Sequence, residues 1–241
     1  MSKNRIRRGV ILAAGDGGRM GTLTHRLPKV LLPVKGKPLI FHPIESMLNA
    51  GIREIAIIVG YLNQKVETIL KASELNANIS FVYNPDYLGG NALSVNTAGQ
   101  WAQGEPFVLC MGDHIIDPGF IAHFLDRHNS DETLGIDYLP SGHHIIDEAT
   151  KVSLYSDRKI KQIGKSLVEW DAIDTGVFLI HTNFLQTAHE LIPHIGIHVE
   201  ISDVIRMMIH KGLPFFTRDM SGMFWADVDT PDDLELVSGG V

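Results

Sequence analysis

Unbroken apolar runs alternate with amphipathic stretches along the first half of the chain. Four runs have the length and composition of buried strands, at residues 9–14, 54–59, 79–83 and 107–113. Helical spacing or helix-start residues mark the stretches 38–51, 62–76, 91–101 and one that begins at Asp117 and Pro118. Strands that alternate with helices are typical of βαβ units, so the pattern predicts an α/β fold around a mostly parallel sheet.

The second half has a different pattern. Residues 151–155 and 159–164 are two short strand-like runs separated by Ser-Asp-Arg, which predicts an antiparallel hairpin. Further elements are expected as a strand at 172–180, a helix at 199–211 and a short strand at 223–231 that leads into a final helix. The chain has no repeat, low-complexity tract or flexible linker, so we expect one domain, residues 1–241, with halves at 3–130 and 131–237.

Composition narrows the class of protein. Of the 241 residues, 44% are apolar and 20% are charged, and no run approaches the roughly 20 apolar residues that span a bilayer. We therefore expect a soluble chain without an integral membrane segment or export signal, and the lone Cys110 in an apolar run fits a reducing cytoplasm. The net charge of −7 is unfavourable for nucleic-acid binding, so an anionic ligand must be held by local positive groups.

The first strand runs directly into a glycine-rich loop at residues 15–18. Unobstructed backbone N–H groups in such a loop bind phosphate oxygens, although a tight turn alone would also explain the glycines. The loop lacks the P-loop motif, and Met20 stands where the dinucleotide fingerprint requires its third glycine. Arg19 and Lys29 add a guanidinium and an ammonium beside the loop, which favours a nucleoside triphosphate as the ligand.

The motif Leu-Ala-Ala-Gly-x-Gly-x-Arg-Met at residues 12–20, followed by Pro28-Lys29 and Pro-Val-x-Gly-Lys-Pro at 33–38, resembles the sugar-1-phosphate nucleotidyltransferases. These enzymes transfer a nucleotidyl group from a nucleoside triphosphate to a sugar or polyol phosphate. The resemblance implies a Rossmann-like three-layer α/β fold with a mixed, mostly parallel central sheet, in which the hairpin is a small antiparallel insertion. It implies catalytic roles for Arg19 and Lys29, and a nucleotide-binding segment made of Leu12, Ala13, Ala14, Gly15, Gly17 and Gly18. Gly18 stands where the family usually has Thr or Ser, so a hydroxyl contact is missing there.

Two motifs at strand ends supply carboxylates. Met-Gly-Asp-His at residues 111–114 and Trp-Ala-Asp-Val-Asp at 225–229 match the family's Gly-Asp and closing motifs. The resemblance implies that Asp113, which also belongs to the nucleotide site, and Asp227 bind Mg²⁺, with Asp229 as the alternative second ligand. Mg²⁺ is commonly held by one or two carboxylates together with substrate phosphates, so two acids from distant strand ends suit phosphoryl chemistry. A helix N-cap would also explain either acid taken alone.

One branch of the family resembles the chain over nearly its whole length. Gly-Gly-Asn-Ala-Leu-Ser at 89–94, Gly-Lys at 164–165 and Asp-Thr-Gly at 174–176 are similar to motifs of the CTP:inositol-1-phosphate cytidylyltransferases. The resemblance implies CTP and inositol 1-phosphate as small-molecule substrates. Other pairs remain open, such as GTP or UTP with a hexose or heptose 1-phosphate and CTP with phosphocholine, as does a catalytically silent nucleotide-binding subunit. The oligomeric state is also open, a homo-oligomer included.

Polar residues of the second half are candidates for binding the acceptor. Lys165 is the candidate for its phosphate, with Lys151 as the rival, because an ammonium neutralises a dianion without strict orientation. Carboxylates accept hydrogen bonds from the hydroxyl groups of a polyol, which makes Asp174 and Glu148 candidates as well. The resemblance adds Thr175 and Gly176 to the acceptor site, and Gly90, Asn91 and Ser94 to the nucleotide site.

Overall fold

The structure, a computed structural model, describes residues 6–126, 131–140, 146 and 148–239. One half of its central sheet consists of β1 (Arg8–Ala13), β4 (Glu54–Val59), β5 (Asn78–Tyr83) and β6 (Phe107–Met111). In this half β1 pairs in parallel with β4 and β6, and β4 pairs in parallel with β5. The prediction that the four apolar runs form a parallel sheet is therefore confirmed.

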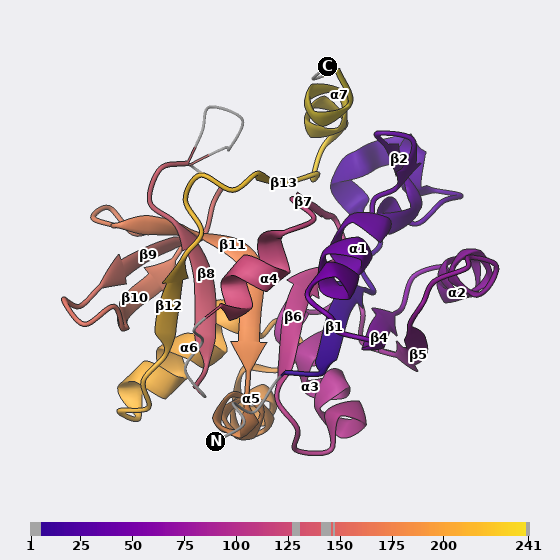
Figure 1. Cartoon of the computed structure of the whole chain (residues 1–241). Coiled ribbons are helices and arrows are strands. Elements are labelled where there is room, and N and C mark those ends of the chain that lie inside the picture. Colours follow the sequence, from indigo (N-terminus) through magenta and orange to yellow (C-terminus); the bar gives the residue numbers. More distant parts are fainter. Residues whose placement is uncertain (1–5, 127–130, 141–145, 147, 240–241) are drawn as a thin grey trace.

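The second half of the chain continues the same sheet, mainly with antiparallel pairs. Its strands are β8 (Thr133–Asp137), β9 (Lys151–Leu154), β10 (Ile160–Gly164), β11 (Ala172–Ile180) and β12 (Phe216–Asp219). The strand order is β10-β9-β11-β6-β1-β4-β5, with β8 beside β11 and β12 beside β8 (Figure 1). The predicted hairpin is confirmed as β9 and β10, and it forms one edge of the central sheet.

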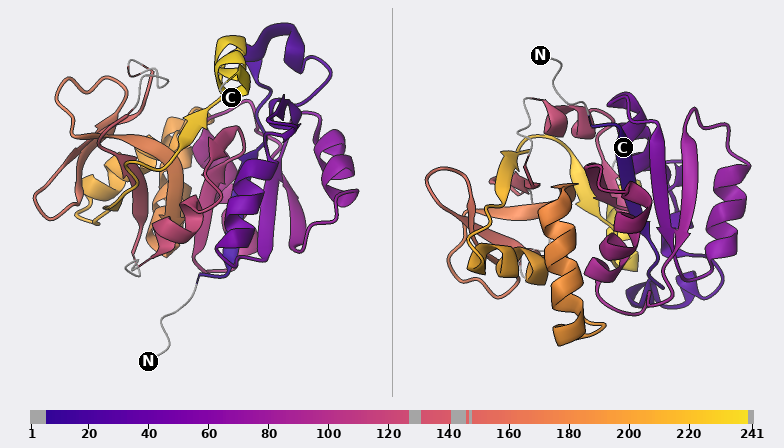
Figure 2. Two further views of the ribbon diagram at one scale, coloured as in Figure 1. Left: turned by 45° about the horizontal axis from the view of Figure 1, so that its top comes forward. Right: turned by 90° about the horizontal axis from the view of Figure 1, so that it is seen from below.

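Helices cover both faces of the sheet and complete a three-layer arrangement (Figure 2). The helices on one face are α3 (Asn91–Ala102), α5 (Thr182–Ile195) and α6 (Ile201–His210). Those on the other face are α1 (Phe41–Asn49), α2 (Asn63–Lys71) and α4 (Phe120–Leu125). Because alternate strand residues point to opposite faces, the adjacent Ala56 and Ile57 of β4 belong to different cores. A strand of this kind must be apolar on both faces, which explains the unbroken runs.

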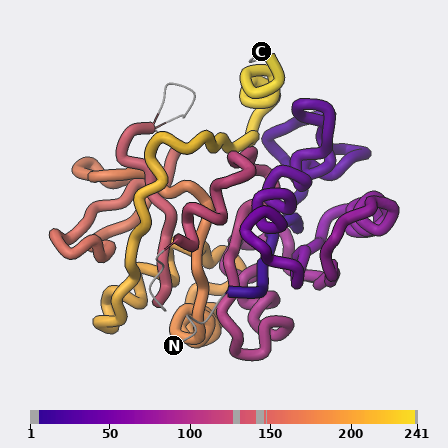
Figure 3. The backbone as a smooth tube through the Cα atoms, in the orientation of Figure 1, coloured from indigo at the N-terminus to yellow at the C-terminus, as the bar shows by residue number. Residues whose placement is uncertain are grey.

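A third, smaller core joins the beginning and the end of the described chain. Two short sheets border it, β2 (Pro33–Val34) with β3 (Lys37–Pro38) and β7 (His114–Ile116) with β13 (Trp225–Asp227). Buried Met20, from the 3-10 helix Gly18–Thr24, packs there with Val34, Ala226 and Val237. The last helix, α7 (Pro231–Gly239), accordingly lies beside β2 (Figure 3). This core holds the glycine-rich loop against the closing motif.

The start of α1 differs from the prediction. Pro38 does not open a helix but lies in β3, and α1 begins at Phe41. The reason is non-local, because the N–H of Leu39 donates to the carbonyl of Leu32 across the short sheet before the helix can start. Pro43 falls in the first turn of α1, where the missing N–H of a proline breaks no helical hydrogen bond.

Two other helices have shorter bounds than predicted. The helix expected from Pro118 begins at Phe120, because the carboxylate of Asp117 accepts the N–H of Gly119 at 2.7 Å and closes a turn first. The helix expected over residues 62–76 ends at Lys71, and turns lead from there to β5. Neither difference moves a strand of the central sheet.

Two expectations from composition can be compared with the fold. Cys110 is fully buried in β6, as its apolar surroundings predict. Within the described residues, no helix is long and apolar enough to cross a membrane.

Candidate active site

The glycine-rich loop forms one wall of a cavity of about 410 Å³ at the end of β1. Residues predicted to bind the nucleotide line it, namely Leu12, Ala13, Gly15, Gly17, Gly18 and Asp113, together with Arg19 and Lys29. Gly17 has a φ of 67°, and a Cβ there would lie 2.8 Å from the Cβ of Lys29. Only glycine tolerates both the positive φ and the close approach, so the loop packs its backbone against the stem of Lys29.

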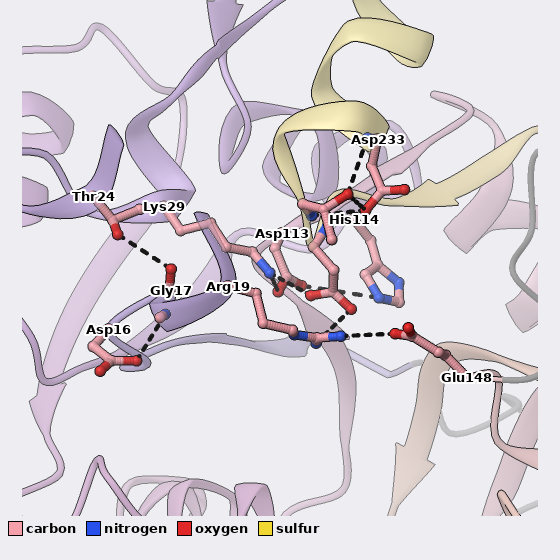
Figure 4. A network of polar contacts seen from close by, with 12 residues as sticks. Asp16, Gly17, Arg19, Thr24, Lys29, Asp113, His114, Glu148 and Asp233 are labelled. Carbon is pink, nitrogen blue, oxygen red and sulfur yellow. Dashed lines mark hydrogen bonds and ion pairs between the residues drawn. The ribbon is translucent and has the colours of Figure 1, made fainter. Parts of the chain in front are cut away.

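A network of ion pairs joins the loop to distant parts of the chain (Figure 4). The ammonium of Lys29, in the short 3-10 helix Lys29–Leu31, lies 2.6 Å from Oδ2 of Asp113 and 2.6 Å from Oδ1 of Asp229. Arg19 places Nη2 2.6 Å from Oδ2 of Asp229 and Nη1 3.0 Å from Oε2 of Glu148. Residues from both halves of the chain therefore meet at the two predicted catalytic cations.

Burial and charge act in opposite directions in this network. Burial of Lys29, whose exposed fraction is 8%, lowers the pKa of its ammonium, but the carboxylates of Asp113 and Asp229 outweigh it and raise the pKa overall. Burial raises the pKa of the Asp113 carboxyl, but the charge of Lys29 and its hydrogen bond outweigh burial and lower that pKa overall. At neutral pH the network thus holds a charged ammonium between ionised carboxylates.

Strand ends and a helix cap fix the acidic residues. β7 and β13 pair antiparallel, which brings Asp227 next to the strand that follows Asp113. The N–H of Val228 donates to the carbonyl of Asp113 at 3.2 Å. The N–H of Asp229 donates to the carboxylate of Asp233, in the first turn of α7, at 3.0 Å. The three candidate metal ligands are therefore held by backbone bonds rather than by loose side chains.

The acidic residues suit a hard divalent cation that is shared with a substrate. Asp113, Asp227 and Asp229 all border one larger cavity. Among the described residues, no group of three or more His, Cys, Asp or Glu side chains could hold a metal ion unaided. This arrangement fits Mg²⁺, which takes oxygen ligands and is usually bound by one or two carboxylates plus substrate phosphates. The ammonium of Lys29 lies between Asp113 and Asp229 and pairs with both carboxylates.

The larger cavity, of about 1180 Å³, extends from the ion-pair network to the hairpin and α6. Predicted acceptor residues line it, namely Glu148, Lys165, Asp174 and Gly176. Burial raises the pKa of Asp174 to about 6, although the N–H of Gly176, 2.7 Å from Oδ1, lowers it. Arg19, Asp113 and Asp229 line both cavities, so the ion-pair network stands where the two meet.

Two acceptor candidates lie outside the lining of either cavity. The side chain of Thr175 is fully buried, and its hydroxyl donates to the carbonyl of Gly135 at 2.8 Å. The ammonium of Lys151 donates to the carbonyl of Lys165 at 3.0 Å, so it braces the end of the hairpin. Of the two lysines that the sequence offered for the acceptor phosphate, only Lys165 lines the large cavity.

Three nucleotide candidates, Ala14, Gly90 and Ser94, also lie outside both linings. The hydroxyl of Ser94 accepts a hydrogen bond from the amide of Asn84 at 3.0 Å in the core. A Cβ at Gly90 would lie 2.0 Å from the carbonyl oxygen of Val199, so this glycine permits a close backbone contact. Asn91 lines the larger cavity, and its amide oxygen accepts the N–H of Ile201 at 2.7 Å.

The structure adds cavity residues that the sequence analysis missed. α6 contributes Arg206 and His210, which lie one helical turn apart. Nη1 of Arg206 donates to the carbonyl of Ile163 in β10 at 2.9 Å, close to the end of the hairpin that carries Lys165. Helical spacing predicts that this helix is amphipathic, but it does not indicate which part of the structure the polar side chains lie against. His114 is a third addition, from the first position of β7.

Comparison with known proteins decides the family. The family model described as nucleotidyl transferase matches residues 8–239. The chain belongs to the nucleotidyl transferase family. Enzymes of this family use a divalent metal ion, which agrees with the acidic residues at the junction of the cavities.

Individual relatives within the nucleotidyl transferase family are similar over most of the chain. A bifunctional IPC transferase and DIPP synthase of Aquifex aeolicus is 34% identical over 229 residues, which is 94% of this chain and 50% of the relative. A protein of the same name from Rubrobacter xylanophilus is 33% identical over 94% of this chain and 50% of its own length. The chain thus spans about half the length of these curated relatives. The inositol-1-phosphate CTP transferase from T. maritima shares the fold, with a TM-score of 0.86, 22% identity and 99% coverage of both chains.

Proposed function

We propose that this chain is a Mg²⁺-dependent cytidylyltransferase that joins CTP to inositol 1-phosphate and releases pyrophosphate. The observation that carries the proposal is that Arg19 lines both cavities, while Lys29 lines the smaller one and pairs with Asp113 and Asp229 where the two cavities meet. A small, glycine-lined cavity suits a phosphate chain, and a large cavity with carboxylates and cations suits a hydroxyl-rich phosphate monoester.

The two halves of the chain divide the substrates between them. In this proposal residues 3–130 bind the nucleotide, with the backbone of Gly15 and Gly17 beside its phosphates. Residues 131–237 supply most of the side chains that line the large cavity, which binds the acceptor. The Arg19–Glu148 ion pair crosses from one half to the other, so a triphosphate that takes Arg19 releases the Glu148 carboxylate toward the acceptor.

Asp113 and Asp227 are our choice of Mg²⁺ ligands. The carboxylate of Asp229 pairs with both Lys29 and Arg19, so its role here is to position these two cations. Asp227 takes no part in that network among the described residues, and β13 holds it beside the strand after Asp113. When bound, the cation neutralises phosphate charge.

The acceptor phosphate belongs near Lys165 and Arg206, because their cationic side chains line the same end of the large cavity. Nη1 of Arg206 donates to the carbonyl of Ile163, and Nη2 pairs with the carboxylate of Asp203. A guanidinium has five N–H donors, so others remain for a phosphate. The ring hydroxyls then extend toward Asp174 and Glu148, whose carboxylates accept hydrogen bonds. Each end of the acceptor thus meets groups of complementary charge or hydrogen-bonding character.

The chemical step needs no general base. An oxygen of the acceptor phosphate attacks the α-phosphorus of CTP, and the bond to the bridging oxygen breaks with release of pyrophosphate. A phosphate monoester is largely dianionic at neutral pH, so no proton has to be removed. Arg19 and Lys29 contribute by orienting the phosphates and by stabilising charge on the transferred and leaving groups.

Support for this substrate pair comes from the relatives. The Aquifex aeolicus and Rubrobacter xylanophilus proteins are named IPC transferases, and the solved structure from T. maritima is an inositol-1-phosphate CTP transferase. Pyrophosphate release tests the proposal when CTP, GTP, UTP and ATP are crossed with inositol 1-phosphate, glucose 1-phosphate, mannose 1-phosphate and phosphocholine. Release with CTP and inositol 1-phosphate alone supports it. Release with a different pair keeps the proposed reaction but changes the assignment of the substrates. No release with any pair favours a catalytically silent nucleotide-binding subunit.

A further inference from the structure

We propose that His114 is an acceptor-binding residue whose Nε2 atom accepts a hydrogen bond from a ring hydroxyl of the polyol phosphate. The inference rests on the proposed function and adds a residue to the same site. His114 follows Asp113 directly, begins β7 and lines the large cavity. In the sequence His114 is the last residue of the motif at 111–114, and it is the surroundings of its ring that indicate a role.

One ring nitrogen of His114 is occupied. Nδ1 lies 3.1 Å from the carbonyl oxygen of Thr175. A carbonyl oxygen only accepts, so Nδ1 must carry the proton that it donates, and in the neutral ring Nε2 is then an acceptor. Thr175 is itself fixed, since its buried hydroxyl donates to the carbonyl of Gly135 at 2.8 Å. The buried Thr175 therefore orients His114 through its backbone.

The strand is shaped to admit the imidazole. Gly176 has a φ of 72°, and a Cβ there would lie 2.2 Å from Cε1 and 2.5 Å from Nδ1 of His114. The ring of Trp225 lies near the imidazole as well, with 6.2 Å between centroids. Only 12% of the His114 side chain is exposed. A glycine, a carbonyl and an indole thus hold one orientation of the ring.

The remaining nitrogen faces a part of the cavity that is rich in acceptors. Nε2 of His114 lies 3.9 Å from Oδ1 of Asp113, and Asp174 lies one residue before the carbonyl that holds Nδ1. Carboxylates and a neutral Nε2 all accept hydrogen bonds, and the cations Lys165, at the end of the hairpin, and Arg206, on α6, line the same cavity. A ligand that suits both regions has hydroxyl donors at one end and an anion at the other, as a polyol phosphate does.

The test uses two substitutions that each keep one of the ring nitrogens. Asn in His114→Asn reaches about the position of Nδ1 and retains the donor to Thr175, but it removes Nε2. Gln in His114→Gln places an amide oxygen near the position of Nε2. We expect His114→Asn to raise the KM for the acceptor about tenfold, the value of one hydrogen bond, with the KM for CTP unchanged. His114→Gln should recover most of the affinity, and His123→Asn, on an exposed position of α4, should have no effect.

Singly deoxygenated inositol 1-phosphates sharpen this test. The analogue that lacks the bound hydroxyl should lose about tenfold in kcat/KM with the wild-type protein and nothing further with His114→Asn. Unchanged acceptor KM in His114→Asn, or an effect on the Mg²⁺ activation constant instead, overturns the role of His114 while the proposed function stands. A wild-type protein that turns over no polyol or sugar phosphate overturns the proposed function and this role together.

Discussion

The ammonium of Lys29 lies 2.6 Å from the carboxylate of Asp229, although the two residues are 200 positions apart in the chain. The contact joins the segment after the glycine-rich loop to the segment after β13, and Asp113 completes it from the end of β6. The small core around Met20 and Val237 holds these segments together. Fold and candidate chemistry are thus linked through one buried cation.

Replacement of Lys29 should affect both activity and stability. Lys29→Met removes a charge that the transition state requires, so we expect kcat to fall by about 10²–10³. It also leaves two carboxylates without their buried partner, which should lower the free energy of unfolding by about 3 kcal/mol. Pyrophosphate release and urea denaturation measure the two effects. Lys35→Met, at an exposed turn, is the matched control, and a Lys29→Met protein with wild-type kcat would refute the role.

The two closing aspartates should differ in their response to Mg²⁺. Asp227→Asn removes a proposed ligand, so the Mg²⁺ concentration for half-maximal activity should rise at least about tenfold. Asp229→Asn instead releases Lys29 and Arg19, so it should lower kcat and stability with a smaller change in Mg²⁺ dependence. Activity titrations with MgCl₂ distinguish them, and the reverse pattern would assign the metal to Asp229.

Asp174 should make stability depend on mildly acidic pH. Its pKa of about 6 in the folded protein exceeds the ordinary 3.8, so the folded state keeps a proton that the unfolded state has released. The free energy of unfolding should therefore fall as pH rises from about 4 to about 6, by about 2–3 kcal/mol in total. Urea denaturation at a series of pH values measures this decrease, and the free energy of unfolding of Asp174→Asn should not show it. Identical pH profiles for the two proteins would show that Asp174 ionises normally.

The same titration should appear in catalysis. Below about pH 6 the protonated Asp174 loses capacity as an acceptor, so the KM for inositol 1-phosphate should rise as pH falls. The KM of Asp174→Asn should be higher at neutral pH and less dependent on pH. A wild-type KM that stays constant between about pH 5 and 7 would contradict contact between Asp174 and the acceptor.

Arg206 should bind the acceptor and not the nucleotide. Arg206→Gln removes a cation from the large cavity, so the KM for inositol 1-phosphate should rise about tenfold or more while the KM for CTP stays within about twofold. Lys211→Gln, an exposed cation at the end of the same helix, is the control. If Arg206→Gln raises the KM for CTP instead, the large cavity belongs to the nucleotide.

The sequence predicts the parallel half of the sheet because its strands are apolar on both faces and carry a local signal. The sequences of β8 and β12 contain no comparable apolar run. These strands form because they pair with distant strands, β8 with β11 and β12 with β8. Pro38 shows the same limit, because its hydrogen-bonded neighbours and not its helix-start propensity decide its conformation. The local sequence pattern therefore predicts the parallel strands and the main helices, but not the elements that depend on distant hydrogen-bond partners.

The candidate site likewise contains residues that the sequence motifs predict and residues that only the folded structure reveals. Motif spacing names Arg19, Lys29 and the aspartates, and the fold brings them together. Spacing does not give side-chain direction, however: Asp174 and Gly176 line the cavity, whereas the side chain of Thr175 between them is buried and bonds to Gly135. Arg206 and His114 gain a candidate role only when α6 and β7 pack against their neighbours. The motif at 111–114 assigns a role to Asp113 alone, and no motif includes Arg206.

The most direct test of the central claim follows CTP and inositol 1-phosphate by ³¹P NMR in the presence of Mg²⁺ and the wild-type protein, with Lys29→Met as the impaired reference. Joining of the substrates predicts a new pair of coupled diphosphate resonances and an equal amount of inorganic pyrophosphate, both formed about 10²–10³ times more slowly with Lys29→Met. Resonances of CMP or CDP without those of the joined product would show hydrolysis instead of transfer. That result, or a spectrum that does not change, would contradict the proposed function.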